Sequence, residues 1–234
     1  MMSNWDQTYD AIALLPSLLP YASASELAEL ERNLTLLSPA TLAWMISRGR
    51  WQPARHLMLL NQAILEAIDE AAAGKLDGLV VSMPPQHGKS ELSSKYLPAW
   101  YVGTFPERRV ILVGYEADFA ANWGYKAREV LAQCGQLFGV RVVRTRSAAH
   151  RWDLEGREGG MTTAGVGGPI TGKGAHLLII DDPVKNDEEA RSATRRQKQW
   201  EWWQSVASTR LRPGGLVMLI QTRWHRDDLS GRIL

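Results

Sequence analysis

The chain has 234 residues, of which 45% are hydrophobic and 22% charged, and its formal net charge is +2. This length and balance are typical of one well-packed globular domain. The single cysteine, Cys134, excludes a disulfide framework and a cysteine-based zinc site. The apolar runs are too short to span a bilayer, and Asp6 and Asp10 stand where a signal peptide would carry basic residues. We therefore expect a cytosolic protein that does not associate with a membrane.

Residues 1–50 are predicted to form a small helical region. Ser23-Ala-Ser-Glu26 is a capping-box pattern, and leucines follow it at helical spacing. Ser38-Pro39 predicts the start of another helix, with Ser as the N-cap and Pro at the first helical position. A third helix is expected from Pro53 to Gly74, a glycine suited to the residue after a helix.

From residue 76, short apolar runs alternate with helical stretches. The expected strands are 79–83, 109–114, 140–144, 176–181 and 215–221, and the expected helices are 88–103, 117–134 and 187–209. Pro98 is expected to kink or end the first of these helices. A glycine-rich stretch, 156–174, interrupts the alternation, and a hairpin is one interpretation of its flanks. The alternation predicts an α/β fold with a mainly parallel central sheet flanked by helices.

The segment Ser82-Met-Pro-Pro-Gln-His-Gly-Lys-Ser90 follows an apolar strand and opens a helix. Such a P-loop directs backbone N–H groups and the positive end of the helix dipole at a polyphosphate. Lys89 is expected to reach the β- and γ-phosphates of ATP, and Ser90 to ligate Mg²⁺. The residues predicted to line the nucleotide are Gln86, His87, Gly88, Lys89 and Ser90. Met83 replaces the usual first glycine, and the rigidity of Pro84-Pro85 is one substitute for it.

A second motif is Leu177-Leu-Ile-Ile-Asp-Asp182, an apolar strand that ends in two carboxylates. A buried parallel strand delivers such residues to the carboxyl edge of the sheet, where ligands bind in open α/β folds. Asp181 is expected to hold Mg²⁺, directly or through water, and Asp182 to orient or deprotonate the attacking water. ATPases more often carry Glu at the second position, and Asp is one methylene shorter. The alternative interpretation is a solvated acidic turn before Pro183.

A third apolar strand, Gly215-Leu-Val-Met-Leu-Ile-Gln-Thr222, also ends in polar residues. Taken alone, Gln221 and Thr222 would be an ordinary strand end. The three motifs together resemble phage terminase large subunits over roughly residues 51–234. The matching segments are Pro84-Pro-Gln-His-Gly-Lys-Ser-Glu91, Pro98-Ala-Trp100, Gly168-Pro-Ile-Thr-Gly-Lys-Gly174, Leu178-Ile-Ile-Asp-Asp-Pro183 and Thr222-Arg-Trp-His-Arg-Asp-Asp-Leu229.

The resemblance implies a P-loop ATPase domain of the additional-strand class over residues 51–234, with ATP and Mg²⁺ as cofactors. It also implies a homo-oligomeric ring on the portal protein of a procapsid in the host cytoplasm. Such a ring pumps double-stranded DNA and works with a small terminase subunit. The family carries a C-terminal nuclease as well, and because this chain ends at Leu234 we expect a fragment without that domain.

The resemblance also assigns roles to individual residues. Lys89 and Ser90 take the phosphate and Mg²⁺ places, Asp181 the metal place, and Asp182 the water-activating place. Gln221 and Thr222 take the place that couples hydrolysis to movement. Candidates for contact with adenine are Trp51, Gln52, Arg55 and His56, for which helix capping and packing is the alternative interpretation.

Family members supply an arginine in trans to the ATP of the neighbouring subunit. The glycine-rich segment before the acidic strand is one place for it, and here that segment carries Lys173. Lysine keeps the charge but lacks the planar fork of arginine. Either Lys173 takes this catalytic role or Arg151 or Arg157 does, and the alternative for Lys173 is a surface charge in a loop.

Two basic runs are candidates for DNA phosphate contact: Arg191, Arg195, Arg196 and Lys198 in one, and Arg141, Arg144, Arg146 and Arg151 in the other. Such contacts would be independent of DNA sequence. Solvated charge or a subunit interface is the alternative, and the 10 tryptophans are expected mainly in packing rather than in base stacking. Competing functions are a helicase-like translocase outside packaging and a nucleotide-binding scaffold without turnover; a small-molecule kinase lacks support because no lid segment is visible.

Overall fold

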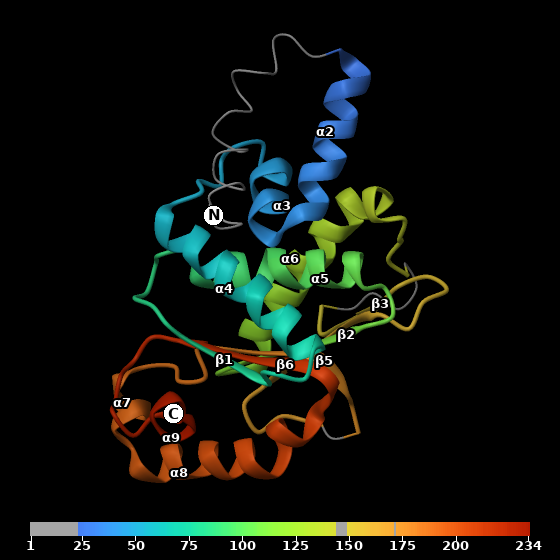
Figure 1. Cartoon of the computed structure of the whole chain (residues 1–234). Coiled ribbons are helices and arrows are strands. Elements are labelled where there is room, and N and C mark those ends of the chain that lie inside the picture. Colours follow the sequence, from blue (N-terminus) through green and yellow to red (C-terminus); the bar gives the residue numbers. More distant parts are fainter. Residues whose placement is uncertain (1–22, 144–148, 171) are drawn as a thin grey trace.

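The computed structural model describes residues 23–143, 149–170 and 172–234, with only the backbone described at Glu31. A central sheet separates two layers of helices (Figure 1). On one side lie α2 (Ala24–Leu37), α3 (Pro39–Ile46), α4 (Arg55–Ala72), α5 (Leu97–Thr104) and α6 (Ala117–Cys134). On the other side lie α7 (Asp187–Arg191), α8 (Ala193–Trp202) and α9 (Leu229–Ile233). Among the described residues, no helix has the length and apolar character needed to cross a membrane.

The sheet contains the strands β1 (Gly78–Ser82), β2 (Arg109–Gly114), β3 (Arg151–Asp153), β4 (Gly160–Gly165), β5 (Ala175–Asp181) and β6 (Leu211–Gln221). Their spatial order is β1-β6-β5-β2-β4-β3. All neighbours pair in parallel except β3, which pairs antiparallel with β4. Since β6 lies between the strand before the phosphate loop and the acidic strand, the predicted additional-strand α/β class is confirmed.

Each central strand divides its apolar side chains between two cores, because successive side chains of a strand point to opposite faces. On β5, Leu177 and Ile179 face the core under α4, α5 and α6, while Leu178 and Ile180 face the core under α8. Burial on both faces explains why these strands are continuous apolar runs in the sequence. Trp202 belongs to the second core, as expected for a tryptophan used in packing.

The predicted N-terminal helices are present with the predicted caps. Ser23 and Ser38 each accept a hydrogen bond from the backbone of the third helical residue in a complete capping box. The indole Nε1 of Trp100 donates to the Leu36 carbonyl at 2.9 Å, and the Ala40 N–H donates to Oδ1 of Asn61 at 3.0 Å. The helices before residue 50 therefore pack directly on the α/β layer.

The glycine-rich stretch contains a strand that the sequence did not reveal. β4 occupies Gly160–Gly165 and forms an antiparallel pair with β3, so the hairpin interpretation is confirmed in part, with one strand inside the glycine-rich stretch rather than beside it. A side chain on Gly165 would meet the Ala117 backbone nitrogen at 2.8 Å, so glycine here permits close backbone approach rather than a loop. The prediction of a strand over 140–144 is wrong for residues 140–143, which are the part that the structure describes. Val142 there makes an isolated bridge with Leu154.

Two expected helices differ in detail. The helix predicted over 187–209 breaks at Ser192, which has extended backbone angles and caps α8 by accepting a hydrogen bond from the Arg195 N–H. The helix after the phosphate loop continues past Pro98 to Thr104. Residues Glu91–Tyr96 form a π-helical segment in which the Leu97 N–H reaches the Leu92 carbonyl. This wider turn lies directly before the proline, which cannot donate a hydrogen bond.

Candidate functional site

The three sequence motifs meet at the carboxyl edge of the sheet, because β1, β6 and β5 are parallel neighbours. The backbone of β6 holds the two flanking motifs. The Met83 N–H donates to the Gln221 carbonyl at 3.1 Å, and the Asp182 N–H donates to the Ile220 carbonyl at 2.9 Å. Met83 thus continues the ladder of the sheet, a position that does not require a glycine.

The loop over residues 82–90, which is predicted to bind phosphate and is called the phosphate loop here, has two residues in the left-handed region, Gln86 with φ 62° and Gly88 with φ 78°. A side chain on Gly88 would lie 3.1 Å from Cδ1 of Leu57 on α4, so the loop packs closely against that helix. The ring of His56, in the first turn of α4, donates from Nε2 to the His87 carbonyl at 3.0 Å. His56, predicted as an adenine contact, therefore supports the phosphate loop in this structure.

Lys89 is buried, with 5% of its side chain exposed, and its ammonium group is bound by the two other motifs. Nζ lies 2.7 Å from Oδ2 of Asp182 and donates to Oγ1 of Thr222 at 3.4 Å. Thr222 also donates its hydroxyl to the Met83 carbonyl at 3.3 Å. One cation thus connects the phosphate loop, the acidic strand end and the tip of β6.

Asp182 has the backbone angle φ 42°, which L-residues other than Asn and Asp rarely adopt. Its Oδ1 accepts a hydrogen bond from the Thr222 N–H at 2.9 Å, while Oδ2 pairs with Lys89. Its side chain is 24% exposed, so water can reach it. The turn after β5 therefore presents one carboxylate to the solvent side of the site.

Asp181 is fully buried, and both of its carboxylate oxygens accept hydrogen bonds from hydroxyl groups. Ser90 donates to Oδ1 at 3.0 Å, and Ser94 donates to Oδ2 at 2.7 Å. The pKa of Asp181 is raised to about 6, mainly by burial and also by the nearby Asp182, while the two serine hydroxyls and Lys89 oppose the rise. Sequence reasoning missed Ser94, although its spacing of four residues from Ser90 places both on one helix face.

These residues fit a Mg²⁺–nucleotide complex. Mg²⁺ prefers oxygen ligands and is bound in nucleotide sites by one or two carboxylates together with phosphate oxygens. Ser90 and Asp181 offer such oxygens side by side. Among the described residues, no group of three or more His, Cys, Asp or Glu side chains is placed so that it could hold a metal ion by itself. A metal held here would therefore take further ligands from nucleotide and water.

The remaining predicted ligands differ in their burial and in their hydrogen-bond partners. Gln221 lies on the same strand face as Val217 and Leu219, is 2% exposed, and its amide has no hydrogen-bond partner among the described residues. Gln52 donates its amide to the Gly49 carbonyl at 2.7 Å, and Trp51 is buried in the core. Arg55 is exposed at the start of α4. Of the two residues at the tip of β6, Thr222 contacts Lys89 within the described structure.

The three candidates for a trans-acting cation lie away from the chain's own phosphate loop. Lys173 is two residues before β5 and therefore at the amino edge of the sheet, opposite the loop. Arg157 pairs with Glu107 at 3.1 Å, and Arg151 pairs with Asp153 at 3.3 Å. A role for any of them would require a second subunit.

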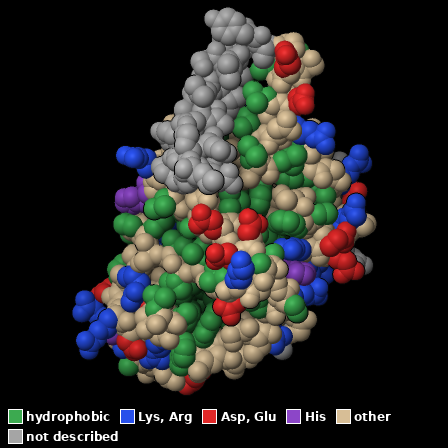
Figure 2. Space-filling model, in the orientation of Figure 1, with side chains coloured by type: hydrophobic (Ala, Val, Ile, Leu, Met, Phe, Trp, Pro, Cys, Tyr) green, Lys and Arg blue, Asp and Glu red, His purple; other side chains and the backbone are tan. Residues whose placement is uncertain are grey.

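The first basic run is extensively paired. Arg191 lies 2.7 Å from Asp187, Arg195 3.7 Å from Glu189, and Arg196 3.2 Å from Asp227. Figure 2 shows basic side chains intermixed with acidic ones on this part of the surface. Trp200, Trp202 and Trp203 pack in the second core rather than standing free for base stacking. These contacts favour solvated charge or a subunit interface over DNA phosphate contact as the role of this run.

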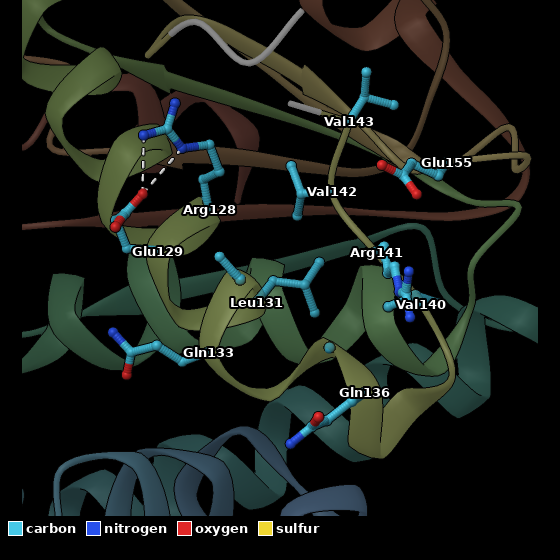
Figure 3. A pocket seen from close by; sticks show the side chains of 12 residues that line it. Arg128, Glu129, Leu131, Gln133, Gln136, Val140, Arg141, Val142, Val143 and Glu155 are labelled. Carbon is cyan, nitrogen blue, oxygen red and sulfur yellow. Dashed lines mark hydrogen bonds and ion pairs between the residues drawn. The ribbon is translucent and has the colours of Figure 1, made fainter. Parts of the chain in front are cut away.

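The second basic run is only partly described, because Arg144 and Arg146 lie outside the described residues. Arg141 is exposed and lines a cavity of about 720 Å³ between the C-terminal half of α6 and residues 140–143 (Figure 3). Glu129 and Glu155 line the same cavity, so its charge is mixed. This cavity contains none of the phosphate-loop residues.

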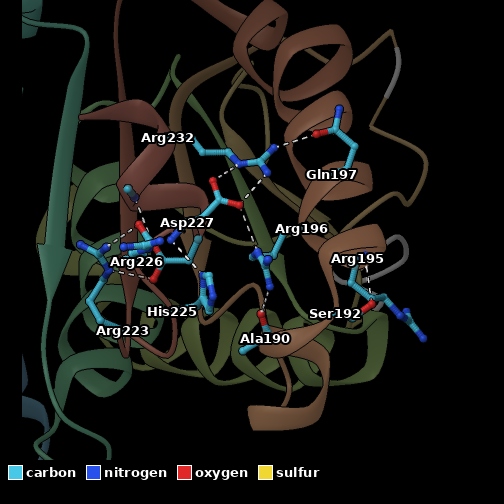
Figure 4. A network of polar contacts seen from close by, with 12 residues as sticks. Ala190, Ser192, Arg195, Arg196, Gln197, Arg223, His225, Arg226, Asp227 and Arg232 are labelled. Atoms are coloured by element: carbon cyan, nitrogen blue, oxygen red, sulfur yellow. Dashed lines mark hydrogen bonds and ion pairs between the residues drawn. The ribbon is translucent and has the colours of Figure 1, made fainter.

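A further polar network joins the segment after β6 to α8 (Figure 4). The Asp227 carboxylate accepts hydrogen bonds from Arg196 at 3.2 Å and from Arg232 at 2.9 and 2.8 Å. Hydrogen bonds from these two guanidinium groups hold the pKa of Asp227 well below its usual range. Arg223 pairs with the buried Asp228 at 2.7 Å in the same segment. The residues that follow Thr222 are therefore fastened to both α8 and α9.

Comparisons with known proteins agree with this architecture. A family model described as terminase large subunit, T4likevirus-type, N-terminal, matches residues 80–232. The crystal structure of the HK97 bacteriophage large terminase is similar in fold, with a TM-score of 0.52 and 17% sequence identity over 77% of this chain and 35% of that chain. This chain thus spans about a third of that protein's length. The comparison with curated proteins finds no match. The chain belongs to the T4likevirus-type terminase large subunit family and carries its N-terminal domain.

Proposed function

We propose that this chain is the ATP-hydrolysing motor domain of a terminase large subunit that drives double-stranded DNA into a procapsid. The observation that carries the proposal is the meeting of Lys89, Asp182 and Thr222 at one point, beside the Ser90–Asp181 pair. A phosphate-binding cation, a metal carboxylate, a water-facing carboxylate and a polar strand tip are the parts that nucleoside triphosphate hydrolysis requires.

In this proposal Lys89 exchanges partners during the reaction. It pairs with Asp182 in the structure, and the β- and γ-phosphates of ATP would take its place beside the ammonium group. Asp182 would then be free to orient a water molecule and to accept its proton at Oδ2. Bound Mg²⁺ would supply charge neutralisation at the phosphates. Ser90 and Asp181 would hold that ion.

Thr222 is the proposed sensor of the nucleotide state. Its hydroxyl contacts Lys89 and the Met83 carbonyl, and its N–H contacts Asp182. When Lys89 moves to the phosphates, Thr222 would lose its contact with Lys89, and its Asp182 partner would lose the ion pair with Lys89. The chain continues from Thr222 into Arg223–Asp228, which is tied to α8, so a change at the nucleotide has a direct route to that helix.

The proposed partners follow from family membership. They are double-stranded DNA, the portal protein, a small terminase subunit and further copies of the chain in a ring, at a procapsid in the host cytoplasm. Lys173, Arg151 and Arg157 are the candidate trans-acting residues, and their distance from the chain's own phosphate loop suits a contribution to a neighbouring subunit.

The test is Mg²⁺-dependent ATP hydrolysis over a series of protein concentrations. Lys89→Ala should abolish it, Asp182→Asn should lower it by about 10²-fold or more, and Lys173→Ala should lower it. Lys75→Ala should leave it unchanged, because Lys75 is an exposed lysine. A specific activity that rises with protein concentration supports a ring. Tight ATP binding by the parent chain with no hydrolysis at any concentration, with portal and DNA present, would instead identify a nucleotide-binding scaffold.

A further inference from the structure

We propose that Ser94 is a positioning residue for the Mg²⁺ site, because its hydroxyl holds the Asp181 oxygen that Ser90 does not reach. The inference rests on the proposed function, since it concerns how the same chain would hold the metal of Mg²⁺–ATP. Ser94 lies outside the phosphate-loop motif and would touch neither metal nor nucleotide. Its action would pass through Asp181.

Each oxygen of the Asp181 carboxylate accepts a hydrogen bond from a different serine hydroxyl. Ser90 donates to Oδ1 of Asp181 at 3.0 Å, and Ser94 donates to Oδ2 at 2.7 Å. A serine hydroxyl has one hydrogen to donate and lone pairs that can bind a metal. Ser90 would therefore be shared between Mg²⁺ and Asp181, while Ser94 serves Asp181 alone.

Burial makes the Ser94 contact consequential. Ser94 and Asp181 both have 0% of their surface exposed, so water cannot replace the hydroxyl without rearrangement. A buried carboxylate oxygen that loses its donor is destabilised, and the group tends to rotate toward another partner. Rotation of Asp181 would move Oδ1 away from Ser90 and spoil the pair of oxygens offered to the metal.

Ser94 and its neighbour Ser93 have different hydrogen-bond partners because they lie on different faces of the helix. Ser94 is one turn after Ser90 and lies in the π-helical segment Glu91–Tyr96, a type of turn that recurs at functional sites. Ser93 is equally buried, but its hydroxyl donates to the Lys89 carbonyl at 2.8 Å, one turn back in the same helix. The two adjacent serines thus form a matched pair, one bound to the carboxylate and one to backbone.

The experiment measures Mg²⁺ affinity without requiring turnover. A fluorescent ATP analogue is titrated into the folded chain, first without metal and then with increasing Mg²⁺, for the parent, Ser94→Ala and Ser93→Ala. Ser94→Ala should raise the Mg²⁺ midpoint about 10-fold or more, the range typical of groups that orient metal ligands. Its affinity for the metal-free analogue should stay within about 2-fold, a small free-energy difference, because Ser94 would not touch the nucleotide. Ser93→Ala should keep the parent midpoint.

If Ser94→Ala does not fold, Ser94→Cys takes its place in the experiment. Cysteine has a similar size but a weaker donor, so the Mg²⁺ midpoint should lie between those expected for the parent and for Ser94→Ala. An unchanged midpoint in a folded Ser94 variant, or an equal shift in Ser93→Ala, overturns the role of Ser94 and leaves the proposed function standing. A parent chain whose analogue binding does not respond to Mg²⁺, although circular dichroism shows it folded, overturns the proposed function and this inference with it.

Discussion

The ammonium nitrogen of Lys89 lies 2.7 Å from a carboxylate oxygen of Asp182, although the two residues belong to loops that follow different strands. The Lys89 side chain is buried, the Asp182 side chain is partly exposed, and Thr222 contacts both residues. Under the proposed function, nucleotide would therefore compete with Asp182 for Lys89. Nucleotide binding would then also release the Asp182 carboxylate to act on water.

Asp182→Asn is expected to separate binding from hydrolysis. Asparagine tolerates φ 42° and keeps an oxygen for the Thr222 N–H, but it cannot accept a proton from water. We expect the rate of hydrolysis to fall by about 10²-fold or more. ATP affinity should be kept or increased, since Lys89 loses its charged competitor. Single-turnover hydrolysis and equilibrium ATP binding measure the two effects, with the exposed Asp77→Asn as control. Equal losses in both quantities would contradict this assignment.

The buried Asp181 predicts a stability that falls as pH rises. Its pKa is about 6 in the folded chain, against 3.8 for an ordinary aspartate, so between these values the folded state keeps a proton that the unfolded state has lost. The free energy of unfolding should therefore decrease across this window by on the order of 3 kcal/mol and be level above it. Urea unfolding from pH 3.5 to about 7 tests this in the parent and in Asp181→Asn. The prediction fails if the variant shows the same slope.

Gly88→Ala is expected to damage the phosphate loop more than its backbone angle alone requires. Gly88 and Gly74 have similar angles, φ 78° and φ 70°, but a side chain on Gly88 would meet Leu57 at 3.1 Å while one on Gly74 meets nothing within 4 Å. Gly74→Ala should cost about 1–2 kcal/mol of stability. Gly88→Ala should cost more and also weaken ATP binding. Thermal unfolding and ATP titration compare them, and partial recovery of binding in Gly88→Ala with Leu57→Ala would identify the contact as the cause.

Asp227→Asn should loosen the segment after β6 from α8 and α9. Arg196 and Arg232 hold the pKa of Asp227 below its usual range, so this carboxylate stabilises the fold above its ordinary pKa and the contribution is lost as pH falls below it. Hydrogen exchange should become faster in Arg223–Asp228 and in the first turns of α8. Asp187→Asn is the matched control, because Asp187 also pairs with an arginine but within a single helix. Equal exchange rates in the two variants would show that the network does not fasten these elements.

The parts of the fold that the sequence predicts are those with strong periodic patterns. β2 and β5 are buried on both faces and appear as apolar runs, and α6 was bounded correctly at both ends. β4 was hidden because close backbone approach requires glycine at both of its ends, and glycine usually indicates a loop. The break between α7 and α8 was not predicted because its sign in the sequence is a single serine, Ser192, whose hydroxyl caps α8.

The sequence predicts those parts of the candidate site whose residues directly follow parallel strands. Lys89, Ser90, Asp181 and Asp182 meet as expected because parallel strands bring their carboxyl ends to one edge. Which of Gln221 and Thr222 contacts Lys89 depends on side-chain alternation at a strand tip, which a sequence leaves open. Ser94 could not be distinguished from Ser93 without knowing which helix face meets β5.

The position of β6 has a mechanical consequence. Its last residues are hydrogen-bonded to Met83 on one side and to Asp182 on the other, so the strand acts as a spacer of fixed width between the two halves of the site. Those halves cannot open or close independently without breaking the edge of the sheet. Under the proposed function, a displacement caused by a phosphate at Lys89 would therefore pass along the chain beyond Thr222. The sheet would stay in place while α8 moved.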